Sequence, residues 1–312
     1  MKKLFVSALA LLATVTLSAQ DITALFNEGT TSFNNKDFKG AASKFEEVLK
    51  LGDDNEDAEE VVNNAGKYLG ICFHKLAGSA AAHKQYDEAL EHCKKSIEIS
   101  KEYNPAQVKK TEGMMSKVCF AKGAGLLNEK NYEGAIDVLK DGFELRPNDA
   151  RIALALARAY CEAGEFVDGM DVYEQILAKG DNPKYAEPIA QAKQDMAIYT
   201  NNQIAKMQGE NDFDGMLEMA EKMLEKNAQS PIAHSVRLQA YTSKKSFDKV
   251  IEYGEEAAAA QTDDEAKSQM YFFLGAAYNA KEMPQQAVAA FRKVTAGPNV
   301  EGAKQAIASL AK

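Results

Sequence analysis

The chain has 312 residues, of which 46% are hydrophobic, and it carries a formal net charge of −9. That apolar share is enough to build a continuous core. The acidic balance excludes nucleic acid as an expected partner, because phosphate contacts need clustered lysine and arginine, and it disfavours anionic lipid surfaces for the same reason.

The first residues have the pattern of a secretory signal peptide. A basic start at Lys2 and Lys3 precedes an apolar stretch over residues 4–17, and Ala19 supplies the small residue that precedes cleavage. The apolar stretch is shorter than the roughly 20 residues of a membrane span, and no cysteine follows it for lipid attachment. We expect residues 1–19 to be removed, leaving a soluble, exported, periplasmic protein of a bacterium.

A short element then recurs seven times: an aromatic residue followed three positions later by a small or apolar one. The pairs are Phe38/Ala41, Tyr86/Ala89, Tyr132/Ala135, Phe166/Gly169, Phe213/Met216, Phe247/Val250 and a weaker copy, Pro284/Ala287. The interval is 34 residues between the third and fourth copies and between the fifth and sixth, which is the period of a helix–turn–helix repeat. Each copy therefore predicts the start of the second helix of a pair.

The fourth unit shows the expected layout most clearly. Asp149 supplies a helix cap before an alanine-rich helix over residues 150–163, and Gly164 ends that helix. Phe166 opens the second helix, and the Gly-Asp-Asn-Pro run at residues 180–183 breaks it.

Three units are longer than 34 residues, and the excess precedes their first helices, in residues 57–82, 105–130 and 183–210. These stretches are rich in alanine, lysine and glutamate, which favours lengthened helices over inserted loops. Residues 300–310 predict a last helix that covers the final apolar face.

The pattern resembles the tetratricopeptide repeat family. The match is carried by Leu25, Gly29, Ala41, Phe45 and Val48 in the first unit, Gly123, Leu126, Ala135, Leu139 and Pro147 in the third, Leu238, Tyr241 and Val250 in the sixth, and Leu274, Gly275, Tyr278, Ala287 and Phe291 in the seventh. The chain has no tryptophan, so the aromatic residue that the family favours early in the first helix is absent.

The resemblance implies an all-α, right-handed superhelical solenoid of about seven antiparallel helix pairs over residues 22–298, with a capping helix in residues 299–312. It also implies a groove lined by first helices that binds a peptide or protein. The positions that match this lining and serve as candidate site residues are Phe26, Thr30, Phe33, Lys117, Phe120, Leu127, Arg151, Arg158, Gln239 and Phe272. The lysine and asparagine that some members use to clamp a terminal carboxylate are replaced by Phe26 and Thr30.

No catalytic motif, cofactor-binding loop or metal site is predicted. Cys72, His74, His83, His92 and Cys93 are close in sequence, but neighbours such as Cys72 and His74 point to different sides of a helix. We interpret these residues as surface histidines and buried thiols. A disulfide between Cys93 and Cys119, or between Cys72 and Cys93, remains an alternative in an oxidising compartment.

The sequence thus predicts a non-enzymatic protein-interaction scaffold of the cell envelope that holds a partner in its groove. The alternative is a structural or assembly subunit that docks through its convex face or its ends. The identity of the partner and the oligomeric state are left open.

Overall fold

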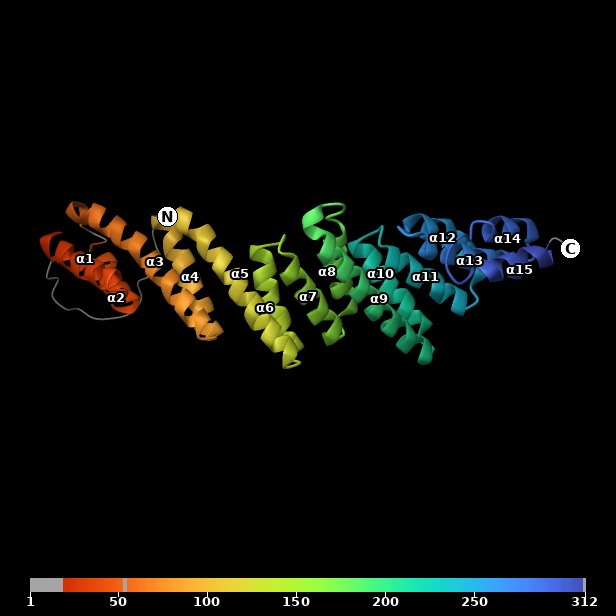
Figure 1. The fold of residues 1–312 in the computed structure, drawn as a ribbon, viewed down its shortest axis with the longest axis horizontal. Helices are drawn as coiled ribbons and strands as arrows, with labels where there is room; N and C mark the ends of the chain where they lie inside the picture. The colour runs from red at the N-terminus through yellow and green to blue at the C-terminus, as the bar shows by residue number, and fades with distance from the viewer. Residues whose placement is uncertain (1–18, 53–54, 311–312) are drawn as a thin grey trace. The chain divides into compact units, whose positions relative to one another are not determined.

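A computed structural model describes residues 19–52 and 55–310, and within these ranges the chain folds into fifteen α-helices without any strand (Figure 1). The predicted signal peptide, apart from its last residue Ala19, lies outside the described residues. The prediction of an all-α helical repeat fold is confirmed.

Seven helix pairs follow one another, and we number them repeats 1 to 7. Their first helices are α1 (Ala19–Asn34), α3 (Glu59–Ala82), α5 (Pro105–Asn128), α7 (Ala150–Ala163), α9 (Ala186–Gly209), α11 (Pro231–Ser243) and α13 (Asp264–Ala280). Their second helices are α2 (Phe38–Gly52), α4 (Tyr86–Tyr103), α6 (Tyr132–Leu145), α8 (Phe166–Leu177), α10 (Phe213–Lys226), α12 (Phe247–Ala260) and α14 (Pro284–Phe291), and α15 (Val300–Leu310) follows the last pair.

The recurring aromatic–small element marks the start of every second helix. Each of the seven begins at the first residue of its element. The residue three positions later is buried in all seven repeats, including the bulkier Met216 and Val250. Its burial follows from the close approach of the two helices: at Gly275, for example, an added Cβ atom would lie 2.7 Å from the ring of Phe291.

The turn inside each pair has the same backbone geometry in all seven repeats. The residue two positions before the second helix has a positive φ, between 53° and 88°, and only in repeat 4 is it a glycine, Gly164. The next N–H donates to the carbonyl five residues earlier at 2.8–3.0 Å, as Glu165 does to Tyr160. This is a Schellman motif, which satisfies carbonyl groups at the end of the first helix.

The extra residues of the long repeats lie in helices, as favoured from composition. α3, α5 and α9 have 24 residues each, whereas α7 has 14 and α11 has 13. Short 3₁₀ turns, η1 (Glu56–Ala58) and η2 (Pro183–Tyr185), precede α3 and α9. Pro188 is the third residue of α9, where its missing N–H breaks no helical hydrogen bond.

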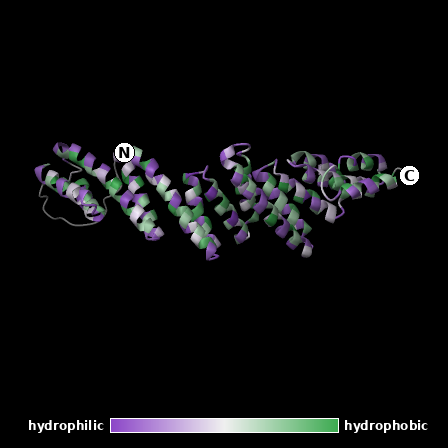
Figure 2. Ribbon diagram, viewed as in Figure 1, coloured by the Kyte–Doolittle hydropathy of each residue, from purple (hydrophilic) through white to green (hydrophobic). Residues whose placement is uncertain are grey.

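The chain divides into two compact units, and the division falls inside α5. The N-terminal unit extends to Lys122 and includes the short segment Glu144–Arg146, and the C-terminal unit contains residues 123–143 and the chain from Pro147 onward. Hydrophobic and hydrophilic residues are interleaved along the helices of both units, as expected when each helix buries only part of its surface (Figure 2).

Candidate interaction surface

The candidate residues of α1 belong to a cluster of aromatic rings in the N-terminal unit. The ring of Phe33 lies 5.1 Å from that of Tyr68 on α3 and 5.4 Å from that of Phe38 on α2, and Phe26 contacts both Phe45 and Tyr68. Both phenylalanines remain half-buried. Edge-to-face contacts of this kind stabilise packing between helices, so these two rings contribute to the core as well as to the surface.

Thr30 lies between the two phenylalanines on the same helix face. Its hydroxyl donates to the carbonyl of Phe26 at 2.9 Å, so the side chain is turned back on its own helix.

A neutral hydrogen-bonded cluster joins α3, α4 and α5. The Ser96 hydroxyl donates to the Gly70 carbonyl at 2.7 Å and lies 3.0 Å from the Thr111 hydroxyl. Thr111 Oγ1 also lies 3.0 Å from His74 Nδ1, and Gln107 Nε2 donates to it at 3.3 Å. Because Thr111 lies in the N-terminal half of α5, this cluster seats the lengthened part of that helix.

Two of the candidate residues lie further along α5 than this cluster. Lys117 is exposed and Phe120 is half-buried one turn further along. Burial, and then the positive charges of Lys75 and Lys110, lower the pKa of His74, which places those lysines near the same point on α3 and α5. Lys75 and Lys110 were not among the predicted site residues.

In the C-terminal unit, both candidate arginines of α7 are bonded to carboxylates of the chain. Arg151 Nη2 lies 3.0 Å from Asp149 Oδ2, and Asp149 also caps α7 by accepting the N–H of Arg151 at 3.2 Å. Arg158 Nη2 donates to Asp195 Oδ2 at 3.2 Å. The arginine side chains are still 64% and 50% exposed, so each presents a charged surface while being held by a partner.

Asp195 is the centre of an ionic cluster that joins α7, α8 and α9. It is buried, and it accepts hydrogen bonds from Arg158, from the hydroxyl of Tyr173 at 3.1 Å and from Gln191 at 2.8 Å. Burial, and then the Asp195 charge, raise the pKa of Tyr173, so its hydroxyl is a neutral donor. The ionic cluster holds α9 against α7 and α8, as the neutral cluster holds α5 against α3 and α4.

The surface next to the ionic cluster contains an apolar residue that the sequence prediction missed. Ile198 on α9 is 49% exposed, which is unusual for a large apolar side chain in the described chain. Beside it, the Tyr199 hydroxyl donates to Glu162 of α7 at 2.6 Å. Ile198 does not belong to the regularly spaced apolar residues of a helix core, so no pattern in the sequence identified it.

The remaining candidates are all half-buried. Leu127 and Gln239 are half-buried on α5 and α11. Phe272 on α13 is half-buried, and its ring lies 5.6 Å from that of Phe291 on α14. Nothing in the structure tests whether the ten predicted residues bind a partner, and their role stays a prediction.

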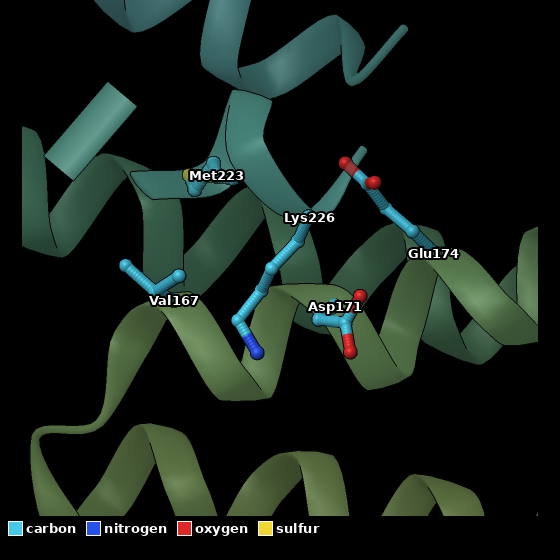
Figure 3. A pocket seen from close by; sticks show the side chains of 5 residues that line it. All are labelled: Val167, Asp171, Glu174, Met223 and Lys226. Carbon is cyan, nitrogen blue, oxygen red and sulfur yellow. The ribbon is translucent and has the colours of Figure 1, made fainter. Parts of the chain in front are cut away.

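The contact between α8 and α10 forms a shallow hollow, shown in Figure 3. Val167, Asp171 and Glu174 line it from α8, and Met223 and Lys226 from α10, with no room for a water molecule between them. The Lys226 ammonium lies 2.9 Å from Asp168. This hollow is a packing contact between second helices and offers no space for a ligand.

The clustered histidines and cysteines are directed to separate partners. His74 contacts Thr111, His83 Nδ1 contacts the Ser79 carbonyl at 2.8 Å, and the ring of His92 stacks on Phe73. All four cysteines are free thiols. Burial raises the pKa of Cys72, Cys93 and Cys161 to about 12, so these thiols are protonated and poorly nucleophilic at neutral pH.

Charge is divided between the two kinds of helix. In repeats 2 to 6, every second helix has more acidic than basic residues, and no first helix has an acidic excess. For example, α8 has three acidic residues and no basic one, whereas α5 has four lysines and one glutamate. In repeats 2 to 6 the first helices are therefore the less acidic side, whereas in repeat 1 the order is reversed, because α1 has two acidic residues and no basic one.

Comparison with known proteins agrees with this architecture. Residues 126–192 match the tetratricopeptide repeat family model. The matched stretch contains the end of α5, all of α6, α7 and α8, and the start of α9, and the other helix pairs of the described chain have the same design. Repeats of this family are protein-interaction modules.

A relative from wheat, Triticum aestivum, is named Hsp70-Hsp90 organizing protein. It is 27% identical to the chain over 180 residues, a stretch that is 56% of the chain and 27% of the wheat protein. The chain thus spans about a quarter of the length of that relative.

Solved structures that align with the chain include two further repeat proteins. A tetratricopeptide repeat protein from Parabacteroides merdae is 12% identical, with 94% of the chain and all of that protein covered and a TM-score of 0.29. The TPR2AB domain of yeast Sti1, in complex with an Hsp90 peptide, is 14% identical, with 78% and 99% covered and a TM-score of 0.32.

Among the described residues, every helix is too short or too polar to cross a lipid bilayer.

Proposed function

We propose that the protein is a non-enzymatic scaffold that binds a peptide or protein partner along the first helices of its repeats. The observation that carries this proposal is the division of charge in repeats 2 to 6: their second helices are acidic, whereas their first helices have no acidic excess and present half-buried apolar residues together with basic ones. Such a mixture of apolar anchors and charges is typical of protein-recognition surfaces. The name of the wheat relative, which describes an organising role between two proteins, supports an interaction function.

In each unit the proposed surface contains different side chains. In the N-terminal unit it contains Phe26, Thr30, Phe33, Lys117 and Phe120, and in the C-terminal unit Leu127, Arg151, Arg158, Gln239 and Phe272. We add Ile198, because its exposed side chain is available to a partner.

Photo-crosslinking in intact cells tests this surface. A photoreactive phenylalanine analogue replaces Lys117, Ile198 or Gln239 on first helices, and in matched controls it replaces Lys50, Glu98 or Glu221 on second helices. The proposal expects a discrete protein adduct from the first-helix positions. Adducts that form only from the second-helix positions would contradict it and would favour docking of the outer surface into an assembly.

The proposed location is the bacterial cell envelope, after export. It is supported by the sequence of residues 1–19, with Lys2 and Lys3, an apolar stretch and Ala19. Mass spectrometry of the protein purified from its native host tests it: the expected first residue is Gln20. A protein that retains Met1, or that fractionates with the cytoplasm, would contradict export.

A further inference from the structure

Four lysines of the N-terminal unit lie along two adjacent first helices. Lys67 and Lys75 belong to α3, and Lys110 and Lys117 belong to α5, and all four are exposed. Lys110 and Lys117 are seven residues apart, so they lie on one face of α5. Lys67 and His74 are related in the same way on α3. We call the four lysines the basic stripe.

The contacts of α3 with α5 bring Lys75 and Lys110 close to the same point. His74 Nδ1 lies 3.0 Å from Thr111 Oγ1, next to Lys110. One turn further along, a Cβ atom added at Gly78 would lie 3.6 Å from Met114. The two helices thus run in the same direction. Lys75 and Lys110 lie next to the His74–Thr111 contact, and Lys67 and Lys117 lie toward opposite ends of the stripe.

No carboxylate of the described chain forms an ion pair with any of the four lysines, although such pairs are common elsewhere in the same unit. Lys122 lies 2.5 Å from Asp87, and Lys95 lies 2.8 Å from Glu91. Lys67 instead contacts the amide oxygen of Asn64 at 3.4 Å.

The nearest acidic residues of the same helices are badly placed to neutralise the stripe. Glu112 is two positions from Lys110 and thus lies around the helix from it. Glu60 is seven residues before Lys67, about 10 Å along the helix. The stripe is therefore a local excess of positive charge on a protein whose net charge is −9.

The length of the stripe indicates the size of its ligand. From Lys67 to the level of Lys117, near residue 81 of α3, the helix rises about 20 Å. An extended peptide covers that distance with about six residues.

The negative charge on the rest of the protein determines which kind of polyanion can bind to the stripe. Nucleic acid and anionic membranes present many phosphates over a long distance, and the acidic second helices repel them. A short segment of aspartate and glutamate is different, because all of its charge lies over the stripe. Acidic residues elsewhere on the protein repel it only weakly, since salt screens charges beyond the Debye length, which is about 8 Å at physiological salt.

We propose that the basic stripe on α3 and α5 binds a short acidic segment, rich in aspartate and glutamate, of a partner protein. This inference rests on the proposed interaction function and names the chemistry of the partner. Each lysine pairs with a carboxylate of the segment, and the half-buried Phe120 on α5 provides an apolar contact at one end of the stripe.

Two quadruple variants of the full chain test this proposal. The first, K67E/K75E/K110E/K117E, reverses the stripe. The matched control, K39E/K50E/K94E/K101E, reverses four exposed lysines on α2 and α4 that also have no ion-pair partner in the described chain. Net charge changes equally in both, and circular dichroism establishes that each variant is folded.

The probes are three labelled molecules of matched length, measured by fluorescence anisotropy in 150 mM NaCl. They are a nine-residue peptide rich in aspartate and glutamate, its asparagine and glutamine counterpart, and a nine-nucleotide thymidine strand. We expect wild type to bind the acidic peptide about tenfold more tightly than the amide peptide, as the sum of several exposed ion pairs. The stripe variant should lose that advantage, and the control variant should keep it within about twofold.

Several results would overturn the proposal. These are equal affinity for the acidic and amide peptides, equal losses in the two variants, or binding of the thymidine strand as tightly as the acidic peptide. Wild-type self-association in light scattering that the stripe variant abolishes would identify a second copy of this chain as the occupant instead. Crosslinking from Ile198 and Gln239 in the C-terminal unit is independent of the stripe, so an adduct there with no acidic-peptide binding would remove this inference alone.

Discussion

Two of the three lengthened helices, α5 and α9, are held in place by polar clusters of different kinds. In the N-terminal unit, Thr111 of α5 takes part in a neutral cluster of hydroxyl, imidazole and amide groups. In the C-terminal unit, a buried carboxylate, Asp195 of α9, takes part in an ionic one. Both clusters satisfy polar groups between three helices, but only the ionic cluster buries a charge, which is costly unless all its partners are present.

The largest expected effect comes from removing the central group of each cluster. Asp195→Leu leaves the hydroxyl of the buried Tyr173 without its acceptor and should destabilise the protein by about 3 kcal/mol. Thr111→Val keeps the shape of the side chain and should cost about 1 kcal/mol. Urea unfolding followed by circular dichroism measures both.

Asp195→Asn is the control, because its amide oxygen can still accept from Tyr173, while the charge is lost and an amide nitrogen replaces the oxygen that accepts from Gln191. Since Arg158 is half exposed, this change should cost about 1 kcal/mol. A loss for Asp195→Leu no larger than that for Thr111→Val would show that the two clusters are energetically equivalent.

A smaller effect should appear as a dependence on pH in the neutral cluster. Burial and the neighbouring charges of Lys75 and Lys110 lower the pKa of His74 from its usual 6.5. A histidine with a lowered folded-state pKa favours folding above 6.5, and this contribution is lost as the pH falls through the folded-state value. The urea midpoint of wild type should therefore fall more between pH 7.5 and pH 5.5 than that of His74→Gln.

His83→Gln provides the comparison, since His83 is an exposed histidine at the end of the same helix. If the two variants respond alike to pH, His74 is not the source of the dependence.

The smallest effects are expected at the turns, where the two units can be compared directly. Lys84 and Gly164 hold the same left-handed position in repeats 2 and 4. Lys84→Gly removes a steric cost and should raise stability by about 0.5 kcal/mol, because the flexibility of glycine offsets part of the gain. Gly164→Lys should lower stability by a similar amount. Changes of the same sign in the two units, measured by urea unfolding, would contradict this account.

The fold was largely predictable from local sequence. The element at Phe38, Tyr86 and their equivalents marks the start of each second helix, and the caps at Asp149 and Gly164 lie where composition placed them. These features depend on residues within a few positions of one another, and short-range patterns record them well.

The surface was much less predictable, because its contacts join residues of different repeats. Arg158 pairs with Asp195, and Tyr199 with Glu162, each 37 residues apart, and the sequence predicted neither pair. Which side chains meet depends on the rotation of one repeat against the next, and periodicity within a helix does not contain that angle. The exposed arginines predicted on α7 were placed on the correct helix, but their partners on the chain were not foreseen.

The seven turns keep one hydrogen-bonded geometry with lysine, asparagine, glutamate or glycine at the left-handed position. Backbone bonds, not side-chain identity, therefore close each helical hairpin, and the position is free to drift under mutation at a modest energetic penalty. The family model matches only residues 126–192, a segment that includes the glycine-containing turn at Gly164. The geometry of the turn can therefore be retained after the residues that form it have changed, and it is a more durable mark of this fold than the residue at the left-handed position.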